Sequence, residues 1–232
     1  MKVMKKQLLL ATLLMATSAL STPRASAQTN TPPATPADME AFYTSVIEKR
    51  TGDILAPLAI KDSAKSNEVF EIITRQYRIM RARDVLIDAQ LEAEGKEDNY
   101  ANRAGQLEAQ SKPLHEYFFA QLSKLLTPEQ VEMVKDKMTY NKVKVTYDAY
   151  NNIIPGLTEA DKAKIVELLK EAREKAVDGG SASEKSAIFQ VYKDQINDYL
   201  NAHGHDVAKA YKDWEDKQAL AKKSDGPNTN PP

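Results

Sequence analysis

The sequence predicts an all-α protein, a helical bundle of about seven or eight helices, and three observations carry this prediction. Apolar residues recur at three- and four-residue spacing almost throughout the middle of the chain. The 232 residues include only 8 Gly and 11 Pro, and most prolines lie near the two ends, so the middle lacks the turn residues that a many-stranded fold needs. Several expected helices begin with capping residues. A β-sandwich or barrel is therefore not expected, and 42% hydrophobic residues suffice for a packed core.

Capping residues and helix stops divide the chain into elements. Asp38 can cap the first helix, Gly95 ends the second, and Pro113 should kink the third. The strongest start is Thr127-Pro128-Glu129-Gln130, which combines an N-cap Thr, a Pro at the first helical position and a Gln three residues after the cap. The expected helices cover about 38–55, 62–94, 98–126, a segment from 127, 143–152, a segment from the cap Thr158 to about 177, one from Ser183 to about 203, and 206–222.

Two terminal segments frame one expected domain, residues 38–221. Residues 28–37 form a Pro/Thr-rich linker and 222–232 a polar tail, and both are expected to be disordered. Within the domain, Leu58–Lys65 and Leu157–Lys164 share four of eight residues at an offset of 99 positions. This similarity suggests two related helical-hairpin halves, although chance resemblance between two helix starts explains it equally well.

The first 27 residues have the three parts of a secretory signal peptide. Three lysines precede an apolar stretch from Gln7 to Leu20, and Ala25-Ser26-Ala27 forms a small-x-small cleavage pattern. The apolar stretch is about 14 residues long, shorter than the roughly 20 that span a bilayer. We therefore expect cleavage after Ala27, a periplasmic or secreted protein, and no membrane span after signal removal.

The composition of the exported chain excludes several kinds of partner. There is no cysteine, which rules out a disulfide framework, a lipid-modified cysteine and a thiolate metal site. The formal net charge of −1 includes four basic residues of the signal peptide, so the exported chain carries about −5. Such a chain lacks the excess of positive charge that nucleic-acid binding requires, so no nucleic-acid partner is expected.

Asp84 and His115 are candidate buried polar residues. Along the second expected helix the apolar stripe passes through position 84, where Asp replaces an apolar residue, and His115 falls on the stripe of the third helix. A buried carboxylate needs an ion pair or hydrogen bonds, which a facing His or Arg supplies. One interpretation is an acid/base site with shifted pKa values. The favoured alternatives are a structural polar pair between helices, or a kink that turns Asp84 to solvent.

Tyrosines and asparagines gather between residues 140 and 152. Aromatic rings and amides suit a sugar, because the C–H faces of a pyranose stack on rings while its hydroxyls need donors and acceptors. The alternative, which carries more weight, is that the tyrosines fill a helix interface and the asparagines end the helix before Pro155-Gly156. The candidate ligand-binding residues are Tyr140, Asn141, Tyr147, Tyr150 and Asn151.

No catalytic or metal-binding motif is assigned. His203-Gly204-His205-Asp206 gathers metal-type ligands, but no third partner is within sequence reach, and a helix stop at Gly204 explains the segment. A Gly-rich phosphate loop, a nucleophile elbow and a zinc-protease helix are all absent from the sequence. We therefore expect no metal and no cofactor, and enzymatic activity is not favoured.

Five motifs, in order along the chain, share their pattern with a known family. They are Thr127–Lys137, Met138–Tyr140, Val145–Tyr150, Glu171–Ser181 and Ile196–Leu200. They resemble an uncharacterised family of exported bacterial proteins, a domain of unknown function that is labelled sugar-binding and occurs near polysaccharide-degrading enzymes. The resemblance covers about Ser45–Asp206 and implies no catalytic residue. The chain departs from the family at Asp194-Gln195, where Gly-Arg is commoner, and at His205, where Tyr is usual, and the lost Arg weakens the implied sugar binding.

A shorter segment, Leu126-Thr127-Pro128-Glu129-Gln130, resembles the Leu-Thr-x-x-Gln signature of small periplasmic stress chaperones built from helical hairpins. The sequence thus favours an exported, non-catalytic accessory protein of glycan use that binds an oligosaccharide. The alternative is a periplasmic helical chaperone or adaptor that binds a protein partner. A glycan-active enzyme is the third hypothesis.

Overall fold

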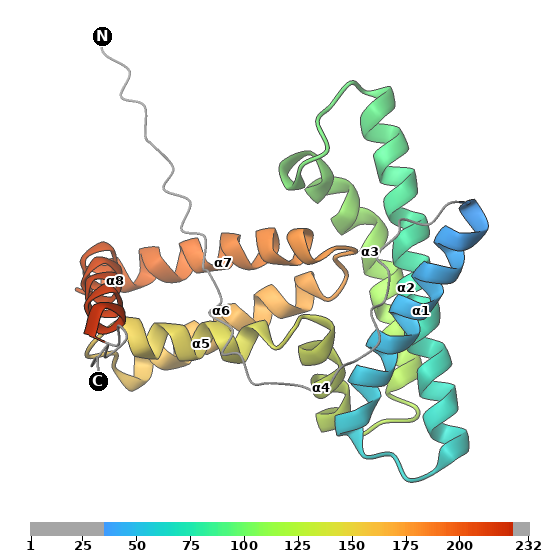
Figure 1. The fold of residues 1–232 in the computed structure, drawn as a ribbon, viewed down its shortest axis with the longest axis horizontal. Helices are drawn as coiled ribbons and strands as arrows, with labels where there is room; N and C mark the ends of the chain where they lie inside the picture. The colour runs from blue at the N-terminus through green and yellow to red at the C-terminus, as the bar shows by residue number, and fades with distance from the viewer. Residues whose placement is uncertain (1–34, 225–232) are drawn as a thin grey trace, which may run out of the picture.

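The computed structural model describes residues 35–224, with side chains described as far as Ala221. These residues form eight α-helices and one short 3-10 helix, without a strand among them, so the predicted all-α bundle of seven or eight helices is confirmed (Figure 1). The signal peptide and most of the two terminal segments lie outside the described residues. The elements are α1 (Pro36–Leu55), η1 (Ala56–Leu58), α2 (Ser63–Ala93), α3 (Tyr100–Leu122), α4 (Pro128–Met138), α5 (Lys142–Ile153), α6 (Glu159–Ala176), α7 (Ala182–Ala202) and α8 (Val207–Ser224).

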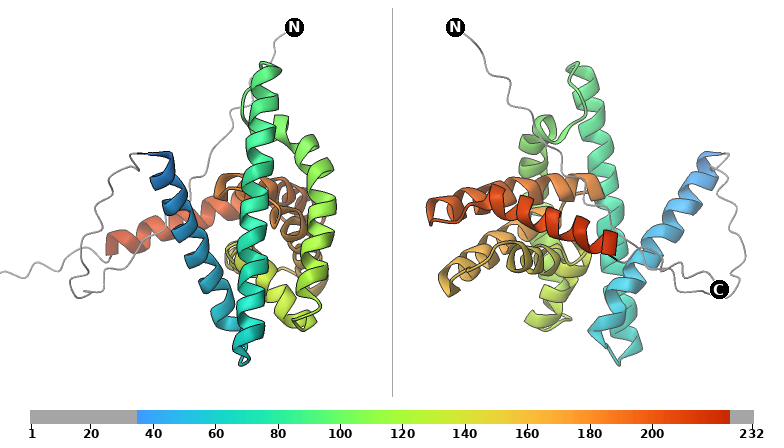
Figure 2. Two further views of the ribbon diagram at one scale, coloured as in Figure 1. Left: turned by 90° about the vertical axis from the view of Figure 1, so that its right-hand side faces the viewer. Right: turned by 60° about the vertical axis from the view of Figure 1, so that its left-hand side comes forward.

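The helices form two lobes that cross one another. Helices α1, α2 and α3 run side by side, and α5, α6 and α7 extend away from them roughly crosswise, with α8 across their far end (Figures 1 and 2). We call α1–α4 the N-terminal lobe and α5–α8 the C-terminal lobe. Helix α4 stands where the lobes meet, and the turn between α6 and α7 reaches the N-terminal lobe at α3 (Figure 1).

Each lobe has its own hydrophobic core. The N-terminal core is built from Ile47, Ile54, Leu58, Val69, Ile73, Tyr77, Met80, Phe118, Leu122, Leu126, Val131, Val134, Met138 and Val177. The C-terminal core is built from Tyr150, Ile153, Ile154, Ile165, Leu168, Leu169, Ala172, Ala176, Ile188, Phe189, Tyr192, Ile196, Leu200, Val207 and Ala210. Consecutive residues at the end of α6 belong to different cores, Ala176 to the C-terminal one and Val177 to the N-terminal one. The α6–α7 turn is therefore anchored in both lobes.

Capping explains where most helices begin. Thr127 and Thr158 each form a capping box, with Gln130 and Asp161 as the reciprocal partners. Asp62 is the N-cap of α2, whereas the residue aligned with it in the second half, Asp161, sits at the third position of α6. The two similar stretches therefore do not place their shared Asp in equivalent positions.

Several boundaries differ from those expected. Helix α1 begins at Pro36, inside the segment expected to be disordered, because Thr35 rather than Asp38 is its N-cap. Ser181 rather than Ser183 caps α7, and α3 ends at Leu122, four residues early. Helix α8 continues to Ser224, into the expected tail. Helix α3 is continuous through Pro113.

Candidate functional site

A pocket of about 420 Å³ lies between the lobes. Helix α3 forms one wall, and the end of α6 with the turn and first residues of α7 forms the other. Its volume falls within the range of small-molecule sites, roughly 300–1,000 Å³. The lining combines apolar and ionisable side chains: Tyr100, Ala104, Leu107, Glu108, Ser111, Lys112, His115, Glu116, Glu174, Lys175, Asp178, Gly179 and Ile188.

His115 and Asp178 join the two walls of this pocket. His115 Nδ1 lies 3.0 Å from Asp178 Oδ2, and both side chains are largely buried. Because an ionised carboxylate can only accept, the Nδ1–H of His115 donates to it. This hydrogen bond and the attraction of the negative charge raise the pKa of His115 above its ordinary value of 6.5, although burial opposes the shift. Phe119, one turn further along α3, packs on the imidazole with ring centroids 4.6 Å apart.

Asp84 lies behind the pocket wall in a separate network. Its Oδ1 accepts from Arg83 at 2.7 Å and is 3.7 Å from an Arg103 nitrogen. Burial raises the pKa of Asp84 despite these arginines. The network reaches the pocket through Arg83 Nη1, which donates to Ser111 Oγ at 2.8 Å.

Glu184 extends this network into the C-terminal lobe. Arg103 Nε donates to Glu184 Oε1 at 3.3 Å, and the other oxygen of Glu184 accepts from the backbone N–H of Gly180 at 2.6 Å. Asp84 and His115 thus face the same junction, but each has its own partner, and no hydrogen bond joins them among the described residues.

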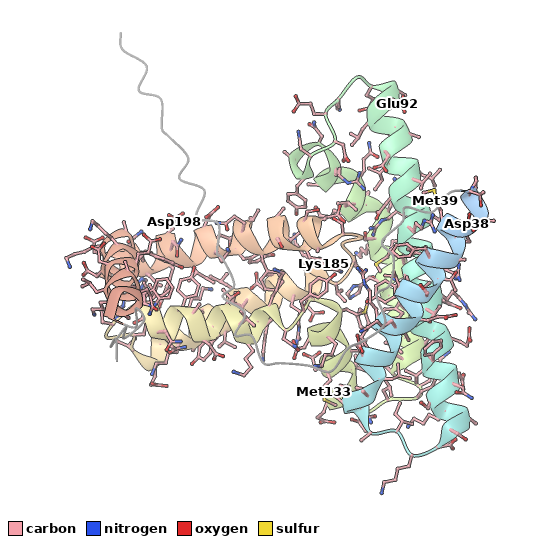
Figure 3. All side chains as sticks on the ribbon, viewed as in Figure 1. Asp38, Met39, Glu92, Met133, Lys185 and Asp198 are labelled. Atoms are coloured by element: carbon pink, nitrogen blue, oxygen red, sulfur yellow. The ribbon has the colours of Figure 1, made fainter. Side chains whose placement is uncertain are left out.

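Lys185 completes the junction from the first turn of α7 (Figure 3). Its side chain is 2% exposed, and Nζ donates to the carbonyl oxygens of Ala176 at 2.9 Å and Val177 at 3.2 Å. Burial lowers the pKa of this ammonium to about 8. Lys185 therefore satisfies two carbonyls at the C-terminal end of α6 and holds the pocket wall.

The tyrosines and asparagines expected to bind a ligand line neither this pocket nor a smaller one between α2 and α3. Tyr150 is 1% exposed, and its hydroxyl donates to Asn197 Oδ1 at 2.8 Å, so its ring belongs to the C-terminal core. Tyr147 is half-buried against the same core. Asn151 donates to the Tyr147 carbonyl within α5.

Tyr140 and Asn141 lie in the turn between α4 and α5. Tyr140 is 44% exposed, and the two residues adopt left-handed backbone conformations with φ of 58° and 54°. The region between residues 140 and 152 is therefore divided between an exposed turn and a buried helix face.

The two histidines near the end of α7 contact different residues. His205 Nε2 is 3.1 Å from Asp161 Oδ2, whereas His203 stacks on Tyr199 with ring centroids 4.0 Å apart. Over residues 35–221 no three His, Cys, Asp or Glu side chains are arranged to hold a metal ion. Among the described helices, none combines the length and apolarity that crossing a membrane requires.

Sequence reasoning singled out Asp84 and His115 and missed the partners that hold them. The sequence does mark Lys185 as a candidate, because it lies three residues before Ile188 and therefore on the apolar stripe of α7. Asp178 and Gly180 were interpreted only as a helix stop. Arg103, Glu184 and Tyr100 gave no local signal, because their positions depend on how the lobes meet.

The fold and the pocket define a two-lobed, all-α protein with a ligand-sized hollow where the lobes cross. The chain belongs to a family of proteins of unknown function, DUF3826, whose model matches residues 44–219. The expected membership of an uncharacterised family is thereby confirmed. No curated protein matches the chain.

Proposed function

We propose that this protein is an exported, non-catalytic accessory protein of glycan use, and that it binds an oligosaccharide in the pocket between its lobes. The observation that carries the proposal is the pocket itself, about 420 Å³, which brings an aromatic ring together with several hydrogen-bonding side chains. This places the proposed site on α3 and the α6–α7 turn instead of on residues 140–152.

The lining offers the chemistry that a sugar needs. The ring of Tyr100 and the side chains of Leu107 and Ile188 provide apolar surface for the C–H faces of a pyranose. Carboxylates such as Glu108 accept from sugar hydroxyls, and Lys112 donates to them. The same pocket is a less natural match for a chaperone, which needs a broad apolar surface for a client chain.

A glycan-active enzyme is the second candidate, and the His115–Asp178 pair favours it. A histidine held by a carboxylate inside a pocket is an arrangement that general acid/base catalysis uses. Mass spectrometry of each bound oligosaccharide after prolonged incubation with the protein separates the two candidates, since a binding protein returns its ligand unchanged.

The test is thermal melting of residues 28–232 against a panel of plant and microbial oligosaccharides, with EDTA and with added Zn²⁺. A ligand at about 100 times its dissociation constant stabilises the native state by roughly 2.7 kcal/mol, which raises the melting temperature by a few degrees. The variant Tyr100→Leu keeps apolar bulk but removes the aromatic face, and it should abolish the shift. Tyr140→Leu is the matched control and should preserve it.

If Tyr140→Leu abolished the shift and Tyr100→Leu preserved it, the binding site would lie at the α4–α5 turn and not in the pocket. No shift with any sugar would reject the proposal and favour the protein-partner alternative, for which an aggregation-suppression assay is the next experiment.

A further inference from the structure

Among the described residues, the second ring nitrogen of His115 has no hydrogen-bond partner. Nδ1 is engaged by Asp178, and no other side chain or backbone group of the described residues forms a hydrogen bond with the ring. His115 lines the pocket, so Nε2 is available to a ligand there. In the protonated ring Nε2–H is a charged donor, whereas in the neutral ring with Nδ1–H it is an acceptor.

Lys112 places a second cationic donor beside His115. The two residues are three apart on α3, so they share one face of the helix, and both line the pocket. Within residues 35–221 no carboxylate lies at ion-pair distance from Lys112. The α3 wall therefore carries two adjacent donors, His115 Nε2 and the Lys112 ammonium, for which residues 35–221 supply no charged acceptor.

Most carboxylates of the pocket are already engaged. Glu174 pairs with Lys135 at 2.8 Å and with Arg173 at 3.2 Å, and Asp178 pairs with His115. Glu108 is 3.8 Å from Lys175 across the pocket. Glu116, at the exposed rim, is the remaining acid. The pocket thus has donors to offer an anion, while its own anions are mostly satisfied.

We infer that the oligosaccharide bound here is acidic, a glycan whose uronate carboxylate lies between His115 Nε2 and the Lys112 ammonium. This inference rests on the proposed function, because it names the ligand class of the same pocket. Charge-assisted hydrogen bonds from two donors select a carboxylate over the hydroxyl or hydroxymethyl group that a neutral sugar presents at the same position.

The selectivity depends on pH in a defined direction. At low pH His115 is protonated and donates to the carboxylate, and its pKa is raised. As pH rises through that value Nε2 becomes an acceptor and repels the same group. The charged groups that face His115 are Asp178 and Glu174 from the end of α6, Lys135 from α4, and Lys112 and Glu116 from α3 itself.

The experiment is isothermal titration of residues 28–232 with a galacturonic acid trimer and with the matched neutral galactose trimer. It is carried out at about 0.15 M salt, where general electrostatic attraction is screened. We expect the acidic trimer to bind at least tenfold more tightly at about pH 6, and this preference to fall severalfold by about pH 8.5. His115→Gln and Lys112→Gln should each reduce the preference, and His115→Gln should remove its pH dependence.

Lys124→Gln is the matched control, because it removes an exposed cation near the end of α3 that does not line the pocket. It should leave both affinities unchanged. Equal affinity for the two trimers, or a preference that His115→Gln leaves undiminished, would overturn the inference and leave the proposed sugar site standing. If neither trimer and no sugar of the wider panel bound, both the acidic-glycan inference and the proposed sugar-binding function would be rejected.

Discussion

The carboxylate of Asp84 lies directly against the backbone of Gly180, so close that a Cβ added at position 180 would be 1.6 Å from Asp84 Oδ2. This approach brings α2 of the N-terminal lobe against the α6–α7 turn. On the same turn, the backbone N–H of Gly180 donates to Glu184. Asp84 is therefore part of the contact that fixes the pocket walls relative to each other.

Gly180→Ala should destabilise the protein by about 1–3 kcal/mol, the usual cost of forcing extra volume into a packed site. The new methyl group must displace Asp84 from Arg83 or move the turn. Urea unfolding followed by circular dichroism measures the change. Gly105→Ala is the control: Gly105 lies within α3 with open space around its Cα, so Ala should stabilise by up to about 1 kcal/mol. Equal effects of the two substitutions would contradict the Asp84–Gly180 contact.

The His115–Asp178 pair predicts a loss of stability with rising pH. A histidine with a raised pKa binds its proton more tightly in the folded state, so its contribution is complete below the ordinary value of 6.5 and disappears as pH rises through the folded value. Urea midpoints measured from about pH 5.5 to 8 should fall. His115→Gln should flatten this part of the curve. His203→Gln should leave it in place, since His203 is exposed and lies at the far end of α7; an identical flattening there would refute the assignment.

Local patterns in the sequence predict the helices well and the site only in part. The capping boxes at Thr127 and Thr158 act within four residues, so the sequence alone reveals them. Asp84 was recognisable as an acid on an apolar stripe. Its contact with Gly180 was not, because it depends on the crossing of two lobes and no periodicity encodes that crossing. The same limit applies to His115, whose partner is 63 residues away.

Tyr147 and Tyr150 show a second limit of prediction from the sequence. Helical periodicity correctly places Tyr147 and Tyr150 near one another on α5, but it does not say whether that face meets solvent or a core. In the structure α6, α7 and α8 cover it, and Tyr150 becomes a core residue with a hydrogen-bonded hydroxyl.

Tyr150→Phe should destabilise the protein by about 1–2 kcal/mol, because it removes a buried hydroxyl and leaves Asn197 Oδ1 without this donor. Tyr147→Phe is the matched control. The Tyr147 hydroxyl has no hydrogen bond to any described residue, so the substitution should cost less than about 0.5 kcal/mol. Urea unfolding compares the two variants. Weakened binding of an identified sugar by Tyr150→Phe, without a change in stability, would count against this structural role.

Lys185 predicts a rise in stability above pH 8, opposite in sign to the effect of His115. Burial lowers its pKa from 10.5 to about 8, so between these values the unfolded chain holds a proton that the folded chain has released. Stability therefore increases with pH across that window. The His115 effect lowers the free energy of unfolding as pH rises, and the Lys185 effect raises it above pH 8. Together they should give a minimum near pH 8 and a recovery towards pH 10.

Lys185→Met removes the titrating group while keeping the long side chain, and it should weaken the recovery above pH 8. A smaller recovery should remain, because burial also lowers the pKa values of Lys142 and Lys193. The variant should also be less stable at pH 7 by about 1–3 kcal/mol, because the carbonyls of Ala176 and Val177 lose their donor. Lys170→Met, on the exposed face of α6, is the control and should retain the recovery. Urea unfolding of the three proteins between about pH 7 and 10 tests this. A recovery of undiminished size in Lys185→Met would show that other groups cause it and would refute the assignment to Lys185.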